Sequence, residues 1–342
     1  MQHTRWWLVA VLCLAGAGWL GACQTSESSV RTKAKAVELL EQADRSFELG
    51  SFAEALELYK LASVAARTEK SGPRFAEAAA QVAATLSVMG QGDGGVQWLA
   101  QAKAEDNGKD LAAHTRVQLA NALALRDASQ FQAALGVFEE LFHTTMEHQM
   151  WGRALQASTL ASVVASPAAR LEWSQRALQA AEASGERAWI AAAYQAIGFV
   201  YEERGDYVGA VEQLRKARDL SPAGSRDRLK SEWALVHNLR LAGELDEAGQ
   251  ILVRIIPEAK ALHARGFAGR DAEWLGRCQE ELAELLAARG QWLEALRAMN
   301  SARQAYQLAE MQDRAPQKWR ELEARFAELK MLRIQHERNR EP

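Results

Sequence analysis

The sequence predicts an all-α protein, a right-handed solenoid of about seven stacked helix–turn–helix repeats that a C-terminal helix closes. A turn signal recurs about every 40 residues between Gly50 and Gly290. Residues that favour helices dominate the composition, with Ala, Leu, Glu, Arg and Gln foremost. Only 6 prolines occur in 342 residues, so long helices are left uninterrupted. A single helix pair cannot bury its apolar face, so the repeats are expected to stack on one another.

Residues 1–22 have the composition of a secretion signal. Met1–Arg5 is a short basic start, and Trp6–Trp19 is an apolar run too short to span a bilayer comfortably. The run ends in Leu20-Gly21-Ala22-Cys23, which resembles the bacterial lipobox. That resemblance implies cleavage before Cys23, a diacylglyceryl group on its thiol and acylation of its new amine. An ordinary signal peptide or a retained membrane anchor are the alternatives.

The residues that follow Cys23 predict a short tether. Residues 23–33 are polar and rich in serine. Ten extended residues reach no more than about 35 Å, so the solenoid is expected to work close to a membrane. In the lipoprotein resemblance, Gln24 favours the outer membrane over the inner one. The expected location is therefore the outer membrane, lipid-anchored, on the periplasmic face.

Charge and cysteine content exclude two classes of protein. Without residues 1–22, 40 Lys and Arg stand against 44 Asp and Glu, too balanced for a nucleic-acid surface. Cys278 is the one cysteine left beside Cys23, so no internal disulfide is expected in the mature chain. Cys278 is expected to be a small buried residue rather than a nucleophile.

The most informative segment is Ala191–Pro222, AAAYQAIGFVYEERGDYVGAVEQLRKARDLSP. It carries Gly198 and Tyr201, then Gly205-Asp206-Tyr207, Ala210 and Pro222. This pattern resembles the tetratricopeptide repeat, and aligning the chain on Gly205 extends the resemblance over residues 34–312. The turn positions of the seven units are Gly50, Gly90, Ser129, Ala165, Gly205, Gly243 and Gly290. Their spacing exceeds the consensus of about 34 residues, so longer helices or loops are expected.

Three further positions recur behind these turns. An aromatic residue or Leu is expected to fill the gap between the paired helices: Phe52, Phe131, Tyr207, Leu245 and Trp292. Three residues later, a small side chain lets the second helix approach the first: Ala55, Ala134, Ala210, Ala248 and Ala295. One helical turn further, large residues face the same seam: Tyr59, Phe138, Leu214, Leu252 and Met299.

Three places depart from the pattern. The turn at Gly90 has Gly92 and Gly95 at the aromatic and small positions, so a looser turn is expected there. Ser166-Pro167 replaces a turn glycine and predicts a helix N-cap followed by a first-turn proline. Pro257 is expected to kink or split its helix, and residues 263–269 to form an irregular insertion.

Residues 313–342 predict a final amphipathic helix and tail. Pro316 starts the helix, and four apolar residues recur at helical spacing: Trp319, Leu322, Phe326 and Leu329. The other faces are densely charged, as a solenoid end in water requires. A partner-binding or coiled-coil helix is the alternative.

No motif for catalysis, cofactor binding or metal binding emerges. The string from Gly90 to Gly95 matches G-x-G-x-x-G, but it follows an expected helix instead of the strand that dinucleotide binding requires. There is no H-E-x-x-H, C-x-x-C or G-x-S-x-G. No enzyme, cofactor or metal ion is therefore expected.

The repeat resemblance implies that one stripe of each first helix lines a groove for an extended peptide or a partner helix. The residues of this stripe are Arg116, Gln195, Phe199, Glu202, Trp233, His237, Arg240, Arg277, Glu280 and Glu284. Trp233 and Arg240 are the predicted anchors, because they combine an aromatic and a cationic group at helical spacing. The alternative is that Trp233 is core and His237 merely surface.

The expected function is a non-catalytic scaffold or adaptor for a cell-envelope assembly, whose partners are envelope proteins or peptides. A periplasmic sensor that captures a peptide or small ligand is the first alternative. A cell-wall-acting enzyme is the second, although the repeats leave no segment long enough for a separate catalytic domain. Fold alone does not assign function, so the partner is not identified by the sequence.

Overall fold

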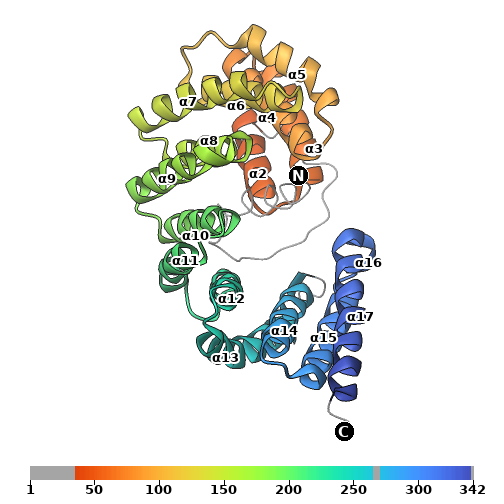
Figure 1. The fold of residues 1–342 in the computed structure, drawn as a ribbon. Helices are drawn as coiled ribbons and strands as arrows, with labels where there is room; N and C mark the ends of the chain where they lie inside the picture. The colour runs from red at the N-terminus through yellow and green to blue at the C-terminus, as the bar shows by residue number, and fades with distance from the viewer. Residues whose placement is uncertain (1–34, 265–269, 340–342) are drawn as a thin grey trace. The chain divides into compact units, whose positions relative to one another are not determined.

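The computed structural model describes residues 35–264 and 270–339, and these form sixteen helices and no strand. The predictions for Cys23 and for the tether lie outside the described residues, as does most of the insertion predicted at residues 263–269, of which His263 and Ala264 are helical. Fourteen of the helices follow one another as seven pairs (Figure 1). The pairs are α2 (Ala36–Glu48) with α3 (Phe52–Thr68), α4 (Gly72–Val88) with α5 (Gly92–Glu105), α6 (Leu111–Asp127) with α7 (Phe131–Glu147), α8 (Trp151–Val164) with α9 (Pro167–Ser184), α10 (Arg187–Glu203) with α11 (Tyr207–Leu220), α12 (Arg226–Leu241) with α13 (Leu245–Ala264), and α14 (Arg270–Ala288) with α15 (Trp292–Leu308).

All seven predicted turns separate the two helices of a pair, so the fold is the expected tetratricopeptide-like solenoid. Gly205 ends α10 with φ 75°, a left-handed conformation that glycine adopts without a Cβ clash. Its N–H donates to the carbonyl of Glu202, and the N–H of Asp206 donates to the carbonyl of Tyr201. The turn at Gly90 has the same pair of bonds, to Ser87 and Leu86, so the expectation of a looser turn there is wrong.

The structure also shows what happens at the other two departures from the repeat pattern, Ser166-Pro167 and Pro257. Ser166 Oγ accepts a hydrogen bond from the N–H of Ala169, and Pro167 is the first residue of α9, which confirms the predicted N-cap. Pro257 lies inside α13, which continues unbroken to Ala264, so Pro257 does not split this helix.

The seam between paired helices confirms two of the three recurring positions. The five alanines and the five large residues behind them are 0% exposed: Ala55, Ala134, Ala210, Ala248, Ala295, Tyr59, Phe138, Leu214, Leu252 and Met299. The aromatic position is less uniform. Phe131 is 47% exposed, so it does not fill a gap between helices, and the other four residues are half-buried. The small and large seam residues therefore set the packing, and the turn aromatic only covers its edge.

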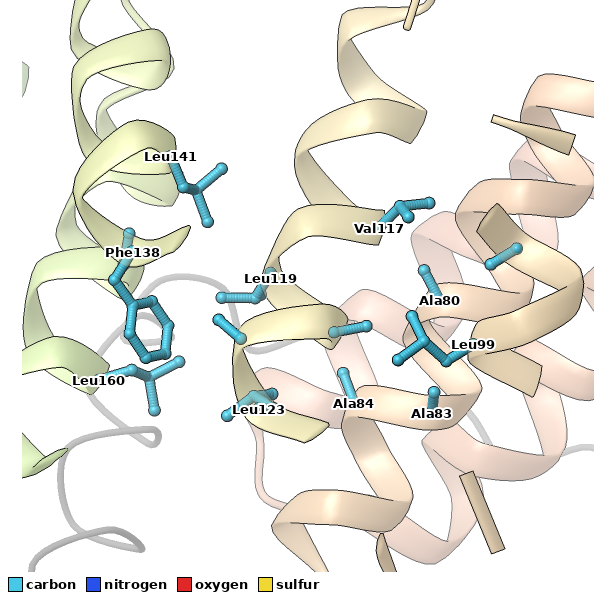
Figure 2. Close-up of a cluster of buried hydrophobic side chains, with 14 of the residues drawn as sticks. Ala80, Ala83, Ala84, Leu99, Val117, Leu119, Leu123, Phe138, Leu141 and Leu160 are labelled. Atoms are coloured by element: carbon cyan, nitrogen blue, oxygen red, sulfur yellow. The ribbon is translucent and has the colours of Figure 1, made fainter. Parts of the chain in front are cut away.

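The chain divides into two compact units between Ala196 and Ile197, inside α10. In the first unit a continuous core runs from α2 to α9, and part of it is shown in Figure 2, where Leu99 and Leu123 lie near small alanines and Phe138 lies close to Leu160. In the second unit one core joins α11 to α14, and it includes Cys278, which is 0% exposed as predicted. Burial raises the pKa of this thiol, as an inert filler requires.

The chain end of the second unit caps the last pair. A short helix, α16 (Met311–Arg314), leads into α17 (Pro316–Arg338), which packs on α15. Leu322 and Leu329 are buried against α15, and Trp319 and Phe326 cover the edge of the same cluster. The predicted capping helix is thus in contact with the solenoid.

Close packing at Gly198 leads to a test of the seam. A Cβ at Gly198 would lie 2.8 Å from Leu214 Cγ, whereas a Cβ at Gly136 would meet nothing within 4 Å. We expect Gly198→Ala to destabilise the fold by about 1–3 kcal/mol through overpacking. Gly136→Ala, the control, should stabilise α7 by about 0.5–1 kcal/mol because it removes backbone freedom. Urea unfolding of both variants measures this, and equal losses would contradict the packing argument.

Candidate functional site

The first unit contains an open pocket of about 470 Å³. The first helices of five successive pairs line most of it, because α2, α4, α6, α8 and α10 each turn one stripe toward the same space. The lining residues are Asp44, Phe47, Glu48, Tyr59, Gln81, Thr115, Arg116, Leu119, Leu141, Met150, Trp151, Gly152, Arg153, Leu155, Gln156, Thr159, Leu160, Ala177, Trp189, Ala192, Ala193 and Ala196.

One part of the lining is apolar. On α8, Trp151, Leu155 and Thr159 follow one another at four-residue spacing and so lie on one face of the helix. On α10, Trp189 is followed by three small residues on the same face, which leave room in front of them: Ala192, Ala193 and Ala196. Gly152 lets the Trp189 ring lie against α8, since a Cβ there would be 3.1 Å from that ring. The resulting wall can bury a large apolar side chain of a ligand.

The other part of the lining is charged and tightly paired. Arg116, one of the predicted groove residues, donates to both oxygens of Asp44, at 2.8 and 2.6 Å. Its Nε lies 2.8 Å from a carboxylate oxygen of Glu77. Tyr59 adds a hydrogen bond of 2.6 Å to Asp44 and accepts one of 3.0 Å from Gln81. This polar network joins α2, α3, α4 and α6, and it fixes Arg116 in place.

The electrostatics of the polar network follow from this pairing. Burial disfavours the ionised form of Asp44, but the hydrogen bonds and charge of Arg116, with the bond from Tyr59, hold its pKa below its ordinary value. Burial and the Asp44 charge raise the pKa of Tyr59, so the phenol stays neutral. Asp44 and Arg116 are therefore both ionised at neutral pH, and they compensate each other.

A second arginine, Arg153 of α8, lies beside this network. It donates to the Ala112 carbonyl at 2.6 Å and to the Thr115 hydroxyl, and its ion pair with Glu77 is loose at 3.6 Å. Burial and the neighbouring positive charge of Arg116 lower the pKa of Arg153 to about 10. It still carries its proton at neutral pH, and its charge faces that of Glu77.

The second unit brings together the predicted anchors. His237 and Arg240 of α12 both bind Glu281 of α14, at 2.7 Å from Nδ1 and 2.9 Å from Nε. Glu281 is 7% exposed in its side chain, so the two cations compensate a buried carboxylate. Burial disfavours protonation of His237, but the bond and charge of Glu281 raise its pKa above the ordinary value. Glu281 is likewise held ionised against its burial, with a lowered pKa.

Aromatic rings flank this ion cluster. Trp233 stacks on His237 with ring centroids 5.9 Å apart and meets Trp274 edge-on at 5.7 Å. The guanidinium of Arg277 lies 5.2 Å from both indole rings. Trp233 is half-buried against the core of the second unit and its Nε1 has no hydrogen-bond partner among the described residues. The Trp233 ring thus packs on the core of the second unit, and its edge lies beside the ion cluster of His237, Arg240 and Glu281.

The other predicted groove residues divide into paired and buried ones. Glu202 accepts a bond of 2.7 Å from Asn238. Glu280 is held by Tyr306 and Lys318, and Glu284 by Arg325, so α17 occupies their side of α14. Phe199 packs partly buried on the core of the second unit. Gln195 is 4% exposed, so its side chain is not offered to a partner.

Sequence reasoning missed the acidic partners of both clusters. Asp44, Glu77 and Glu281 stand one or two repeats away from the cations they bind, and nothing in the spacing of one repeat indicates them. The aromatic pocket wall at Trp151 and Trp189 was missed as well. Extending the first-helix stripe to the units at Gly50 and Gly90 could have found Asp44 and Glu77.

Within residues 35–264 and 270–339, no three His, Cys, Asp or Glu side chains are placed to hold a metal ion. In the same residues, none of the helices combines the length and apolarity needed to cross a bilayer.

Comparison with known proteins supports the fold. No protein-family description matches the chain, and no curated protein matches its sequence. Among solved structures, the chain is similar to a signal-transduction ATPase of the STAND class with a tetratricopeptide-repeat sensor, from Pyrococcus horikoshii. The two share 15% identity with a TM-score of 0.63, over 85% of this chain and 44% of the other, so this chain spans less than half of that protein.

Two further solved structures match this chain over most of their own length. BtubC from P. vanneervenii matches with 14% identity and a TM-score of 0.49, over 68% of this chain and 93% of its own. The C-terminal part of a tetratricopeptide-repeat protein from Cytophaga hutchinsonii matches with 13% identity and a TM-score of 0.48, over 77% of this chain and 93% of its own. The likeness to the Pyrococcus protein establishes a tetratricopeptide-like fold.

Proposed function

We propose that this chain is a non-catalytic scaffold of the bacterial cell envelope, which holds a segment of a partner protein in the pocket of its first unit. One observation carries the proposal. The first helices of five successive pairs place an apolar wall and a fixed polar network around one open pocket. Repeat solenoids use such extended concave surfaces for binding. A pocket of this size lies in the range that encloses a ligand.

The sequence supports the location. The apolar run that ends in Leu20-Gly21-Ala22-Cys23 favours lipidation at Cys23, and Gln24 favours the outer membrane, facing the periplasm. Two or more acyl chains suffice for stable anchoring. We therefore place the scaffold within a short tether of that membrane, where its partner would be an envelope protein. We also propose the cluster at Trp233 and Arg240 in the second unit as a contact surface for an envelope protein.

The test is a mild-crosslinking capture from native envelopes, followed by binding of the purified partner. Gln156→Trp fills the pocket from α8, where Gln156 is half-buried and lines the space. We expect it to abolish capture of the dominant partner, while Gln179→Trp, an exposed residue of α9, retains it. Cys23→Ser should release the chain from the membrane fraction, and replacing Trp233 and Arg240 together should weaken capture while the variant remains folded.

Two outcomes would contradict the proposal. Equal capture by wild type and by folded Gln156→Trp would exclude the pocket as the partner site. A small molecule that copurifies with the chain and raises its melting temperature, with no protein partner captured, would favour the sensor alternative.

A further inference from the structure

We propose that the pocket selects a peptide segment in which a lysine or arginine neighbours an apolar side chain, and that Glu48 recognises the cation. This inference rests on the proposed function and names the chemistry of the bound segment. Arginines commonly bind carboxylates, so the two arginines in the lining would by themselves suggest an acidic ligand. The ligand that we infer is basic instead.

The arginines of the pocket are already compensated. Arg116 makes a two-pronged contact with Asp44 and lies 2.8 Å from Glu77. Arg153 faces Glu77 at 3.6 Å and donates to the Ala112 carbonyl and to the Thr115 hydroxyl. Two positive charges thus stand against two negative ones. An acidic ligand would have to displace an existing carboxylate, at the cost of leaving that group unpaired.

Glu48 is the charged residue of the pocket lining that takes no part in these pairs. It follows Asp44 by one helical turn on α2, is exposed, and lines the pocket beside Phe47. It has no hydrogen bond or ion pair with any residue in 35–264 or 270–339. Arg45, on the same helix, is exposed and does not line the pocket. With Glu48 ionised, the five charged groups of the site therefore sum to one negative charge.

The surroundings of Glu48 favour a cation from a ligand. Burial and the Asp44 charge raise the pKa of Glu48, and the charges of Arg45 and Arg116 offset this only in part, so a bound ammonium or guanidinium would stabilise the ionised carboxylate. Trp151 and Trp189 also add aromatic surface to the lining, and aromatic faces attract cations.

The rest of the lining indicates a peptide as the occupant. A small cation would need only the end of the pocket at Glu48. The apolar wall continues over α6, α8 and α10, through residues such as Leu119, Leu155 and Ala193. A chain that places its cationic side chain at Glu48 can lay a neighbouring apolar side chain against this wall. Both parts of the lining are then used by one segment.

The experiment measures binding of four capped pentapeptides to the full chain by titration calorimetry. The first is acetyl-Gly-Leu-Lys-Leu-Gly-amide, and the other three replace its Lys by Arg, Gln or Glu. We expect the Lys and Arg peptides to bind about fivefold tighter than the Gln peptide, as a partly exposed ion pair allows. The Glu peptide should bind weakest. Glu48→Gln should make the Lys and Gln peptides equal, whereas Glu41→Gln, an exposed acid of α2 outside the lining, should preserve the preference.

Each contrary result has its own meaning. Tighter binding of the Glu peptide, or a cation preference that survives Glu48→Gln, overturns the inference and leaves the scaffold proposal standing. Binding of tetramethylammonium that depends on Glu48, with no peptide bound, also overturns it in favour of a small-cation site. The scaffold proposal itself fails through either outcome of the capture experiment, and peptide titration decides neither of them, so the two failures are distinguishable.

Discussion

Glu281→Gln is expected to destabilise the second unit by about 3 kcal/mol, because two cations lose the buried carboxylate that they share and only His237 keeps a second acid, Glu202 at 3.7 Å. In the wild type, Glu281 binds His237 and Arg240 together, and its side chain is 7% exposed. The amide keeps the shape of the side chain and removes its charge. Urea unfolding followed by tryptophan fluorescence measures the loss. Glu294→Gln, an exposed acid on α15, should change the free energy of unfolding by less than about 0.5 kcal/mol.

The pH dependence separates this charge cluster from mere packing. The folded pKa of Glu281 is lowered, so its contribution is present above pH 4.5 and is lost as pH falls through the folded value. The folded pKa of His237 is raised, so its contribution is full below pH 6.5 and is lost as pH rises through the folded value. The difference in stability between wild type and Glu281→Gln should therefore be largest between pH 4.5 and 6.5. A difference that does not change with pH would contradict the role of His237.

Arg116→Met is expected to cost about 3 kcal/mol in the first unit, because Asp44 and Glu77 would then face each other without the guanidinium between them. The side chain of Arg116 is 14% exposed, that of Asp44 32% and that of Glu77 16%. Water therefore does little to screen the repulsion between the two carboxylates. The measurement is urea unfolding at neutral pH. The matched control is Arg74→Met, which removes a surface pair with Glu69 and should cost less than about 1 kcal/mol.

A double variant checks the reason for that loss. If unpaired carboxylates cause it, Asp44→Asn in the Arg116→Met background should recover part of the stability. A double variant less stable than Arg116→Met alone would show that packing of the arginine stem, and not charge, was lost.

Much of the fold could be predicted from the sequence because its signals are local. The turn at Gly205 needs only a left-handed residue, and the seam needs a small side chain five residues later, as at Ala210. Phe131 shows where such reasoning fails. Its place in the repeat is regular, but of the three recurring positions in this unit only Ala134 and Phe138 are buried, and Phe131 is 47% exposed.

The candidate site could be predicted only in part. Residues on one face of a single helix recur at helical spacing, so the sequence alone predicts four of the site residues: Arg116, Trp233, His237 and Arg240. Their partners are not predicted, because Asp44 is 72 residues from Arg116 and Glu281 is 41 residues from Arg240. Which carboxylate meets which cation depends on the stacking of whole repeats, and that is decided by packing rather than by spacing.

The polar network around Arg116 has a consequence for folding kinetics. In the first unit, most helix contacts join consecutive helices, such as α2 with α3 and α3 with α4, and contacts of this kind form early and quickly. The bonds between Arg116 and Asp44 join residues 72 apart and can close only after the intervening helices have docked. An interaction that forms after the rate-limiting barrier slows unfolding without speeding folding. The network therefore forms late in folding. By slowing unfolding, it lengthens the lifetime of the assembled pocket.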